Sequence, residues 1–99
     1  MKYNTVYDGR GRIRVRYGSR AFDKYSAMGL TDYLKTFEYI NDVKVSTSNG
    51  SVLINYLEDD KDKVLSLLDG ITKEKMRQIA YPIDEELERL NRNFKAKAL

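Results

Sequence analysis

Arginine is the residue whose type and spacing in this chain point most directly to chemistry. Three arginines alternate with apolar residues after Gly11, and two more flank that run. A guanidinium stays charged at physiological pH and offers several N–H donors to carboxylates or phosphates. The candidate interaction surface is Arg10, Arg12, Arg14, Arg16 and Arg20. It would bind acidic protein surfaces, anionic lipid or RNA, or else it is a solvated strand face that blunts edge pairing.

Thiolate and imidazole donors are missing, because the chain contains neither cysteine nor histidine. Their absence removes disulfides, thiolate nucleophiles, imidazole bases and nearly every soft-metal ligand. A general base would have to be Asp, Glu, Lys or Tyr, and no paired arrangement of these is visible. We therefore expect no catalytic residue, no metal ligand and no cofactor in this chain.

The second candidate for chemistry is an acidic run in the middle of the chain. Its carboxylates are oxygen ligands of the kind that Ca²⁺ and Mg²⁺ prefer. The run comprises Glu58, Asp59, Asp60 and Asp62. Its spacing matches no calcium-loop motif, and the start of a helix accounts for the same acids. We therefore interpret the run as a strand-to-helix connection.

Two strands are predicted in the part that carries the arginines, over residues 3–7 and 12–17. An Asp-Gly-Arg-Gly segment separates them and permits a bulge, a bend or a hairpin turn. In the second strand Ile13, Val15 and Tyr17 alternate with the arginines, so one face packs inward while the other stays in water.

The next elements are a helix and a hairpin. Apolar spacing predicts the helix from a cap at Ser19 to about Phe37, weakened by about 1 kcal/mol at Gly29 relative to alanine. Strands over residues 42–48 and 51–57 flank Asn-Gly, a strong hairpin signal because both residues tolerate positive φ. The residues expected on one face of this hairpin are Val43, Val45, Val52, Ile54 and Tyr56.

Three further elements complete the chain. Asp59 or Asp60 is expected to cap a short helix that ends at Gly70, and residues 78–81 read as a last strand that Pro82 stops. From residue 84 to about 97 the acids precede the bases, as in a helix whose charges complement its dipole. Its apolar stripe is thin, so we expect it to project or to pack on a partner.

The predicted fold class is α+β, because strand, helix, hairpin, helix and strand give the βαββαβ order of a ferredoxin-like sandwich. This fold has a four-stranded antiparallel sheet with two helices on one face, here followed by a C-terminal helix. With 99 residues the chain has material for one core. We expect a domain over residues 1–83 and a C-terminal linker helix over residues 84–99.

Several short motifs in this order resemble the N-terminal cytosolic, heavy-metal-associated-like domain of bacterial heavy-metal-transporting P-type ATPases. The motifs are Gly11-Arg12-Ile13-Arg14-Val15-Arg16, Val43-Lys44-Val45, Gly50-Ser51-Val52-Leu53-Ile54-Asn55-Tyr56 and the linker-like Leu90-Asn91-Arg92-Asn93-Phe94-Lys95. The resemblance implies a parent that couples ATP hydrolysis to cation transport across a membrane. The parent's Asp-Lys-Thr-Gly phosphorylation loop is not in this sequence.

The chain departs from this family at the metal site. Metal-binding members carry Cys-x-x-Cys between the first strand and the first helix. In this chain the corresponding loop consists of Gly18, Ser19, Arg20, Ala21 and Phe22, which we call the degenerate metal-loop positions. Without thiolates, and with an arginine that repels cations, this loop is not expected to deliver metal.

The resemblance therefore implies a non-catalytic regulatory or docking domain of a cation-transporting ATPase. Its partners would be the other cytosolic domains of that ATPase, and an anionic membrane surface near the C-terminal helix. The domain would be cytoplasmic and its parent would lie in the plasma membrane. The alternative is a stand-alone interaction module, including a homodimer. RNA binding is disfavoured, because no aromatic pair is expected to face outward beside the arginines.

Overall fold

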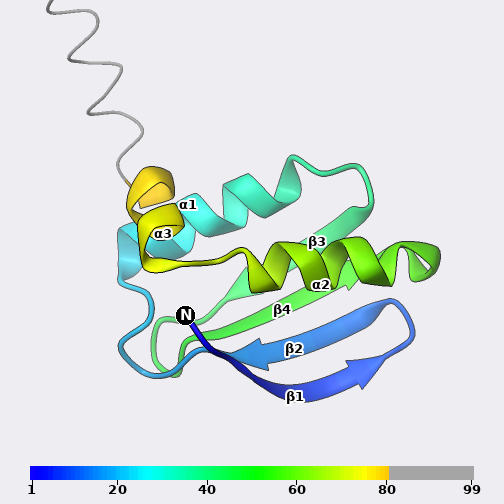
Figure 1. Cartoon of the computed structure of the whole chain (residues 1–99), viewed down its shortest axis with the longest axis horizontal. Coiled ribbons are helices and arrows are strands. Elements are labelled where there is room, and N and C mark those ends of the chain that lie inside the picture. Colours follow the sequence, from blue (N-terminus) through cyan, green and yellow to red (C-terminus); the bar gives the residue numbers. More distant parts are fainter. Residues whose placement is uncertain (81–99) are drawn as a thin grey trace, which may run out of the picture.

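The structure, a computed structural model, describes residues 1–80, which form a mixed α+β fold (Figure 1). The elements are β1 (Asn4–Gly9), β2 (Arg12–Arg16), α1 (Lys24–Lys35), β3 (Ile40–Val45), β4 (Ser51–Tyr56), a 3₁₀ turn η1 (Glu58–Asp60), α2 (Lys61–Asp69) and α3 (Lys73–Ala80). The strands form one antiparallel sheet in the order β1-β2-β4-β3. Over this part of the chain, none of the helices has the length and apolar character needed to cross a membrane.

The segment between the first two strands is a hairpin turn. Gly9 pairs with Arg12, so Arg10 and Gly11 form the connection, and Gly11 takes the positive φ of 68° that favours glycine. The alternation in β2 is confirmed, since Ile13 and Val15 are at most 1% exposed while all three arginines of the strand are exposed.

Helix α1 begins later than the sequence suggested. Its cap is Asp23, whose carboxylate accepts a hydrogen bond from the Ser26 amide at 2.8 Å, while the Ser26 hydroxyl accepts one from the Asp23 amide at 2.9 Å. The predicted cap at Ser19 is wrong, because the chain first makes a turn in which the Ala21 amide bonds to the Gly18 carbonyl at 3.1 Å. The two hydrogen bonds between Asp23 and Ser26 form a reciprocal capping box, which pairs amides that helix geometry leaves without a partner.

The second hairpin is confirmed, but its turn is longer than two residues. The Ser46 amide bonds to the Ser51 carbonyl at 2.9 Å, so residues 47–50 form the connection. Only Gly50 has a positive φ there, at 68°. Asn49 has no left-handed backbone and instead accepts a hydrogen bond from the Ser51 amide through its side chain, at 3.0 Å.

The second helix is confirmed where it was predicted, and α2 ends with Gly70 as its C-cap. Asp60 occupies the N-cap position without a side-chain capping hydrogen bond. The predicted strand over residues 78–81 is wrong for its described part, since residues 78–80 belong to α3. The place beside β2 at the sheet edge is taken by β1. The predicted helix over residues 84–97 lies outside the described residues.

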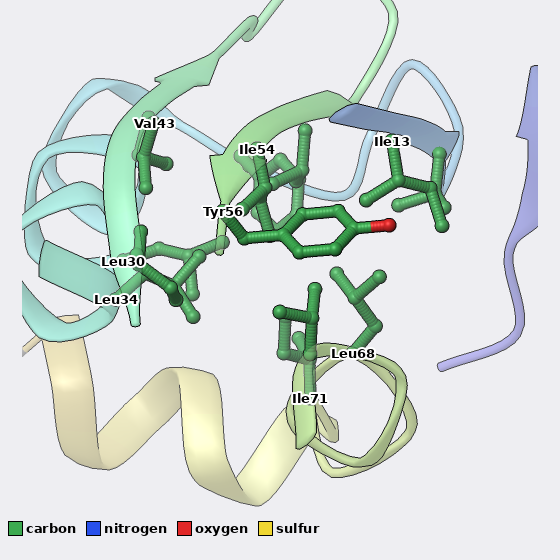
Figure 2. Close-up of a cluster of buried hydrophobic side chains, with 14 of the residues drawn as sticks. Ile13, Leu30, Leu34, Val43, Ile54, Tyr56, Leu68 and Ile71 are labelled. Atoms are coloured by element: carbon green, nitrogen blue, oxygen red, sulfur yellow. The ribbon is translucent and has the colours of Figure 1, made fainter. Parts of the chain in front are cut away.

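The core lies between the sheet and the helices. Figure 2 shows Leu68 and Ile71 below Ile54 and Tyr56, with Leu30 and Leu34 of α1 approaching from the side. The buried cluster consists of Ile13, Val15, Phe22, Ala27, Leu30, Leu34, Ile40, Val43, Val52, Ile54, Tyr56, Val64, Leu68, Ile71 and Met76. The strand residues of this cluster point to one side of the sheet, and α1 and α2 both cover that side. Within the described residues, no helix covers the opposite side of the sheet.

Gly29 has a packing role that its helix propensity conceals. A Cβ atom at this position would lie 2.8 Å from Cγ2 of Ile79 and 2.9 Å from the Ile79 carbonyl oxygen. The missing side chain therefore lets α3 approach the backbone of α1. Glycine has a conformational cost inside a helix, but at this position it permits a close contact between two helices.

Candidate binding site on the open sheet face

The side of the sheet opposite the helices carries a row of positive charge. Arg12, Arg14 and Arg16 project from β2, which is an inner strand, and all three are exposed. Lys44 of β3 lies on the same side, because it and Arg14 are both paired with Leu53. We call the outer surface formed by Tyr7, Arg12, Arg14, Arg16, Lys44 and Leu53 the arginine face.

Tyr7 reaches the arginine face through a β-bulge. Thr5 pairs with the inward-facing Val15, so strict alternation would turn Tyr7 inward as well. The register shifts between Thr5 and Tyr7, and Tyr7 pairs with Arg14 instead. The extra residue in the bulge is Val6. As a result the Tyr7 side chain lies on the outer side of the sheet, 53% exposed, beside Arg14 of the neighbouring strand.

Leu53 is the floor of a shallow hollow on this face. Although it lies on the outer side of the sheet, it is only 7% exposed. Tyr7, Arg12 and Arg14 line the hollow with it, around a volume of about 320 Å³. The apolar stems of long arginine side chains cover apolar surface while their charged ends stay in water. An occupant of this hollow would therefore meet two guanidinium groups, one aromatic ring and an apolar floor.

The five candidate arginines do not form one surface. Arg10 lies in the β1–β2 turn, where its Nε is 3.5 Å from a carboxylate oxygen of Glu58. Arg20 lies in the loop after β2 and lines a different hollow, together with residues of α3. By contrast, Arg12, Arg14 and Arg16 have no carboxylate within 4.0 Å among residues 1–80. The structure thus brings together three of the five.

Two of the four acids after β4 contact bases. Glu58 pairs with Arg10, and the Asp60 carboxylate lies 3.2 Å from the ammonium group of Lys63. Within the described residues, no three Asp or Glu side chains gather closely enough to hold a metal ion. The location of these acids in η1 and the first turn of α2 agrees with their interpretation as a strand-to-helix connection.

The loop over residues 18–22, which the resemblance aligns with a metal site, is held by aromatic packing. Phe22 is 4% exposed and meets the Tyr17 ring edge-on at 5.6 Å between centroids. The Tyr17 ring lies 5.3 Å from that of Tyr3. The Tyr17 hydroxyl donates a hydrogen bond to the Leu68 carbonyl at 2.7 Å. Rings thus fix the base of the loop, while Ser19 and Arg20 are exposed.

The two tyrosines of this cluster are neutral at physiological pH. Burial, followed by a 2.7 Å hydrogen bond from the Tyr3 hydroxyl to Asp69, raises the pKa of Tyr3 to about 12. Burial is also the main cause that raises the pKa of Tyr17, with the charges of Tyr3 and Asp69 acting in the same direction. A phenol held in its protonated form is a hydrogen-bond donor and cannot serve as a general base near neutral pH.

Comparisons of the chain with protein-family models, with curated proteins and with solved structures found no match.

Sequence reasoning missed five contributors to these surfaces, namely Tyr7, Lys44, Leu53, Lys73 and Arg77. Tyr7 was expected on no particular face, and only the bulge turns it outward beside Arg14. Lys73 and Arg77 line a hollow with Arg20, although more than fifty residues of sequence separate them from it. Their spacing of four residues would have marked them as one helix face, had that segment been recognised as a helix.

Proposed function

We propose that this chain is a non-catalytic docking domain whose arginine face binds an acidic protein surface. The observation that carries the proposal is the row of Arg12, Arg14 and Arg16 on an exposed inner strand, free of carboxylate partners among residues 1–80. A cationic surface of this kind accelerates encounter with an acidic partner and sets its orientation. Each exposed ion pair contributes only about 0.2–1 kcal/mol, so the contact is weak and reversible.

The finer fold assignment is ferredoxin-like. The elements β2, α1, β3, β4 and α2 follow the order of the first five elements of a βαββαβ domain, with β4 between β2 and β3. The edge place beside β2, which the last strand would fill in that order, is taken by the N-terminal β1. This correspondence supports a ferredoxin-like domain with an altered edge strand.

We further propose that the parent is a heavy-metal cation-transporting P-type ATPase, and that the domain acts on its cytosolic side as a regulatory element. The support is the resemblance of the Gly-Arg-Ile-Arg-Val-Arg motif and of the β4 segment, which in the structure form adjacent strands. The acidic partner would then be another cytosolic domain of the same protein. Release of the contact would relieve a weak autoinhibition.

The parentage has a direct test in the reading frame that contains this chain. We expect apolar spans and an Asp-Lys-Thr-Gly segment to follow Leu99. A frame without them overturns the proposal of an ATPase parent, while the docking proposal then has to be tested with the chain alone.

The docking proposal is tested with the triple variant Arg12→Ser, Arg14→Ser and Arg16→Ser in the full-length gene product. If the face is autoinhibitory, metal-stimulated ATP turnover rises in the variant, and added salt narrows the difference because the Debye length is only about 10 Å at 0.1 M. The control is Lys2→Ser with Lys24→Ser, which removes exposed positive charge from residues that line neither hollow. Equal turnover in wild type and the first variant, at equal membrane abundance, contradicts docking.

A further inference from the structure

A second basic hollow lies at the end of the molecule where α3 meets the start of α1. It has a volume of about 520 Å³, which is within the range of about 300–1,000 Å³ that is usual for small-molecule sites. Arg20 borders it from the loop after β2, and Lys73 and Arg77 border it from α3. Figure 1 shows the first turns of α1 beside α3 at this end. We propose that this hollow binds a phosphate-bearing small molecule.

The hollow has an apolar floor and a charged rim. Phe22 and Met76 are 4% and 6% exposed, so their side chains belong to the core and form the inner wall. Arg20, Lys73 and Arg77 are exposed. On α3 the two basic residues are four positions apart, and Met76 lies between them on the side that packs inward. A ligand with an apolar body and an anionic end matches this arrangement.

The charge of the hollow is unbalanced among the residues that line it. Three cationic side chains face one acid, Asp23, and that carboxylate is engaged in capping α1 through the Ser26 amide at 2.8 Å. Hydrogen bonding to Ser26, chiefly to its backbone amide, lowers the pKa of the Asp23 carboxyl, so it is charged at neutral pH. None of the three basic side chains has a carboxylate within 4.0 Å in the described part of the chain. Like charges that share a hollow are stabilised by an anion.

The chemistry of the rim favours phosphate over a single carboxylate. Two guanidinium groups present planar forks that bind phosphate oxygens in pairs, and an ammonium group adds a point charge. A phosphate group offers enough acceptor oxygens for donors that come from two different elements of the fold. The apolar floor formed by Phe22 and Met76 would hold the body of the molecule, such as the base of a nucleotide.

The site occupies the place of the loop that lacks thiolates. Arg20, Ala21 and Phe22 are three of the degenerate metal-loop positions, and all three line the hollow. The same stretch of chain that cannot hold a soft cation thus presents a surface suited to an anion. This inference is separate from the docking proposal, because none of its residues belongs to the arginine face.

The test is a titration of the ¹⁵N-labelled chain with ADP, and separately with inorganic phosphate, followed by NMR. We expect saturable shifts confined to residues 20–26 and 73–77, with weaker binding of inorganic phosphate because it leaves the apolar floor uncovered. The variant Arg20→Gln, Lys73→Gln and Arg77→Gln is expected to raise the dissociation constant for ADP by about ten-fold or more, since it removes all three charged donors.

The matched control is Arg12→Gln, Arg14→Gln and Arg16→Gln, which lowers the net charge equally on the arginine face. Its dissociation constant for ADP is expected to stay within about two-fold of wild type, because none of these three arginines lines the hollow and salt weakens the attraction of exposed charges. Equal losses in the two triple variants would show charge attraction without a site and overturn the proposal. So would shifts confined to the sheet face, or the absence of saturable shifts with either probe. None of these results bears on docking, which is measured by ATP turnover in the variant Arg12→Ser, Arg14→Ser and Arg16→Ser.

Discussion

The two faces of the sheet use the same strands in opposite ways. On the side of the helices, Ile13, Val15 and Ile54 are at most 1% exposed and pack in one cluster with α1 and α2. On the other side the neighbouring residues of β2 are arginines in water. The difference shows that the inner face holds the fold together, while the outer face is available for binding at little cost to stability.

Leu53 marks the point where this division is incomplete. It is buried on the outer side of the sheet, in the hollow that it shares with Tyr7, Arg12 and Arg14. The outer face therefore has a small apolar centre within a charged surround. A surface of this kind combines an anchoring contact with charge steering, which is the arrangement of many interaction sites.

The largest expected effect separates the two faces on one strand. Ile13→Ala removes a fully buried side chain and is expected to lower the free energy of unfolding by about 2–5 kcal/mol, because it leaves a cavity. Arg16→Ala, three residues further along β2, is expected to change it by less than about 0.5 kcal/mol. Urea unfolding of both variants measures the difference. Similar losses for the two variants would contradict the division of the sheet.

A smaller effect is expected where the helical layer is tightest. Gly29→Ala places a methyl group against Ile79 of α3. We expect overpacking to lower the free energy of unfolding by about 1–3 kcal/mol. The higher helix propensity of alanine offsets about 1 kcal/mol of this loss. Gly70→Ala is the control, because its new Cβ would meet the Ser66 carbonyl at an ordinary 3.4 Å. Urea unfolding gives the stabilities, and faster amide exchange in α3 of the Gly29 variant would locate the damage. A more stable Gly29 variant would show that α3 is not packed closely on α1.

The smallest effect concerns the loop that leads from the arginine strand to the helical layer. Ser26 lowers the pKa of Asp23, so the stabilising contribution of this charge is complete above the unfolded value of 3.8 and is lost as the pH falls through the lower folded value. Asp23→Ala is expected to melt a few degrees lower than wild type at neutral pH, and the gap narrows at low pH. Asp23→Asn keeps the cap and removes the charge. Thermal melts across the acid range compare wild type, Asp23→Ala and Asp23→Asn. A difference in melting temperature between wild type and Asp23→Ala that does not change with pH would contradict this role.

The sequence predicted the strands and their faces well where the pattern is local. The alternation in β2 and β4 located Ile13, Val15, Val52 and Ile54 in the core, because the side-chain period of a strand is two. The start of α1 was misjudged by several residues, since Ser19 and Asp23 are both acceptable caps and the turn between Gly18 and Ala21 that delays the helix is not visible in the apolar spacing. The strand expected over residues 78–81 failed because a short apolar segment fits a helix as well as a strand.

The sequence by itself determined which chemical groups the chain contains: no thiolate or imidazole donor, and a strand with arginine at every second position. Only the tertiary structure decided which charges act together. It separated Arg10 and Arg20 from the other arginines, turned Tyr7 outward at a bulge, and brought Lys73 and Arg77 to the hollow of Arg20. The physical reason is that pairing registers and helix contacts join segments that are far apart in the chain, and local pattern carries no information about those contacts.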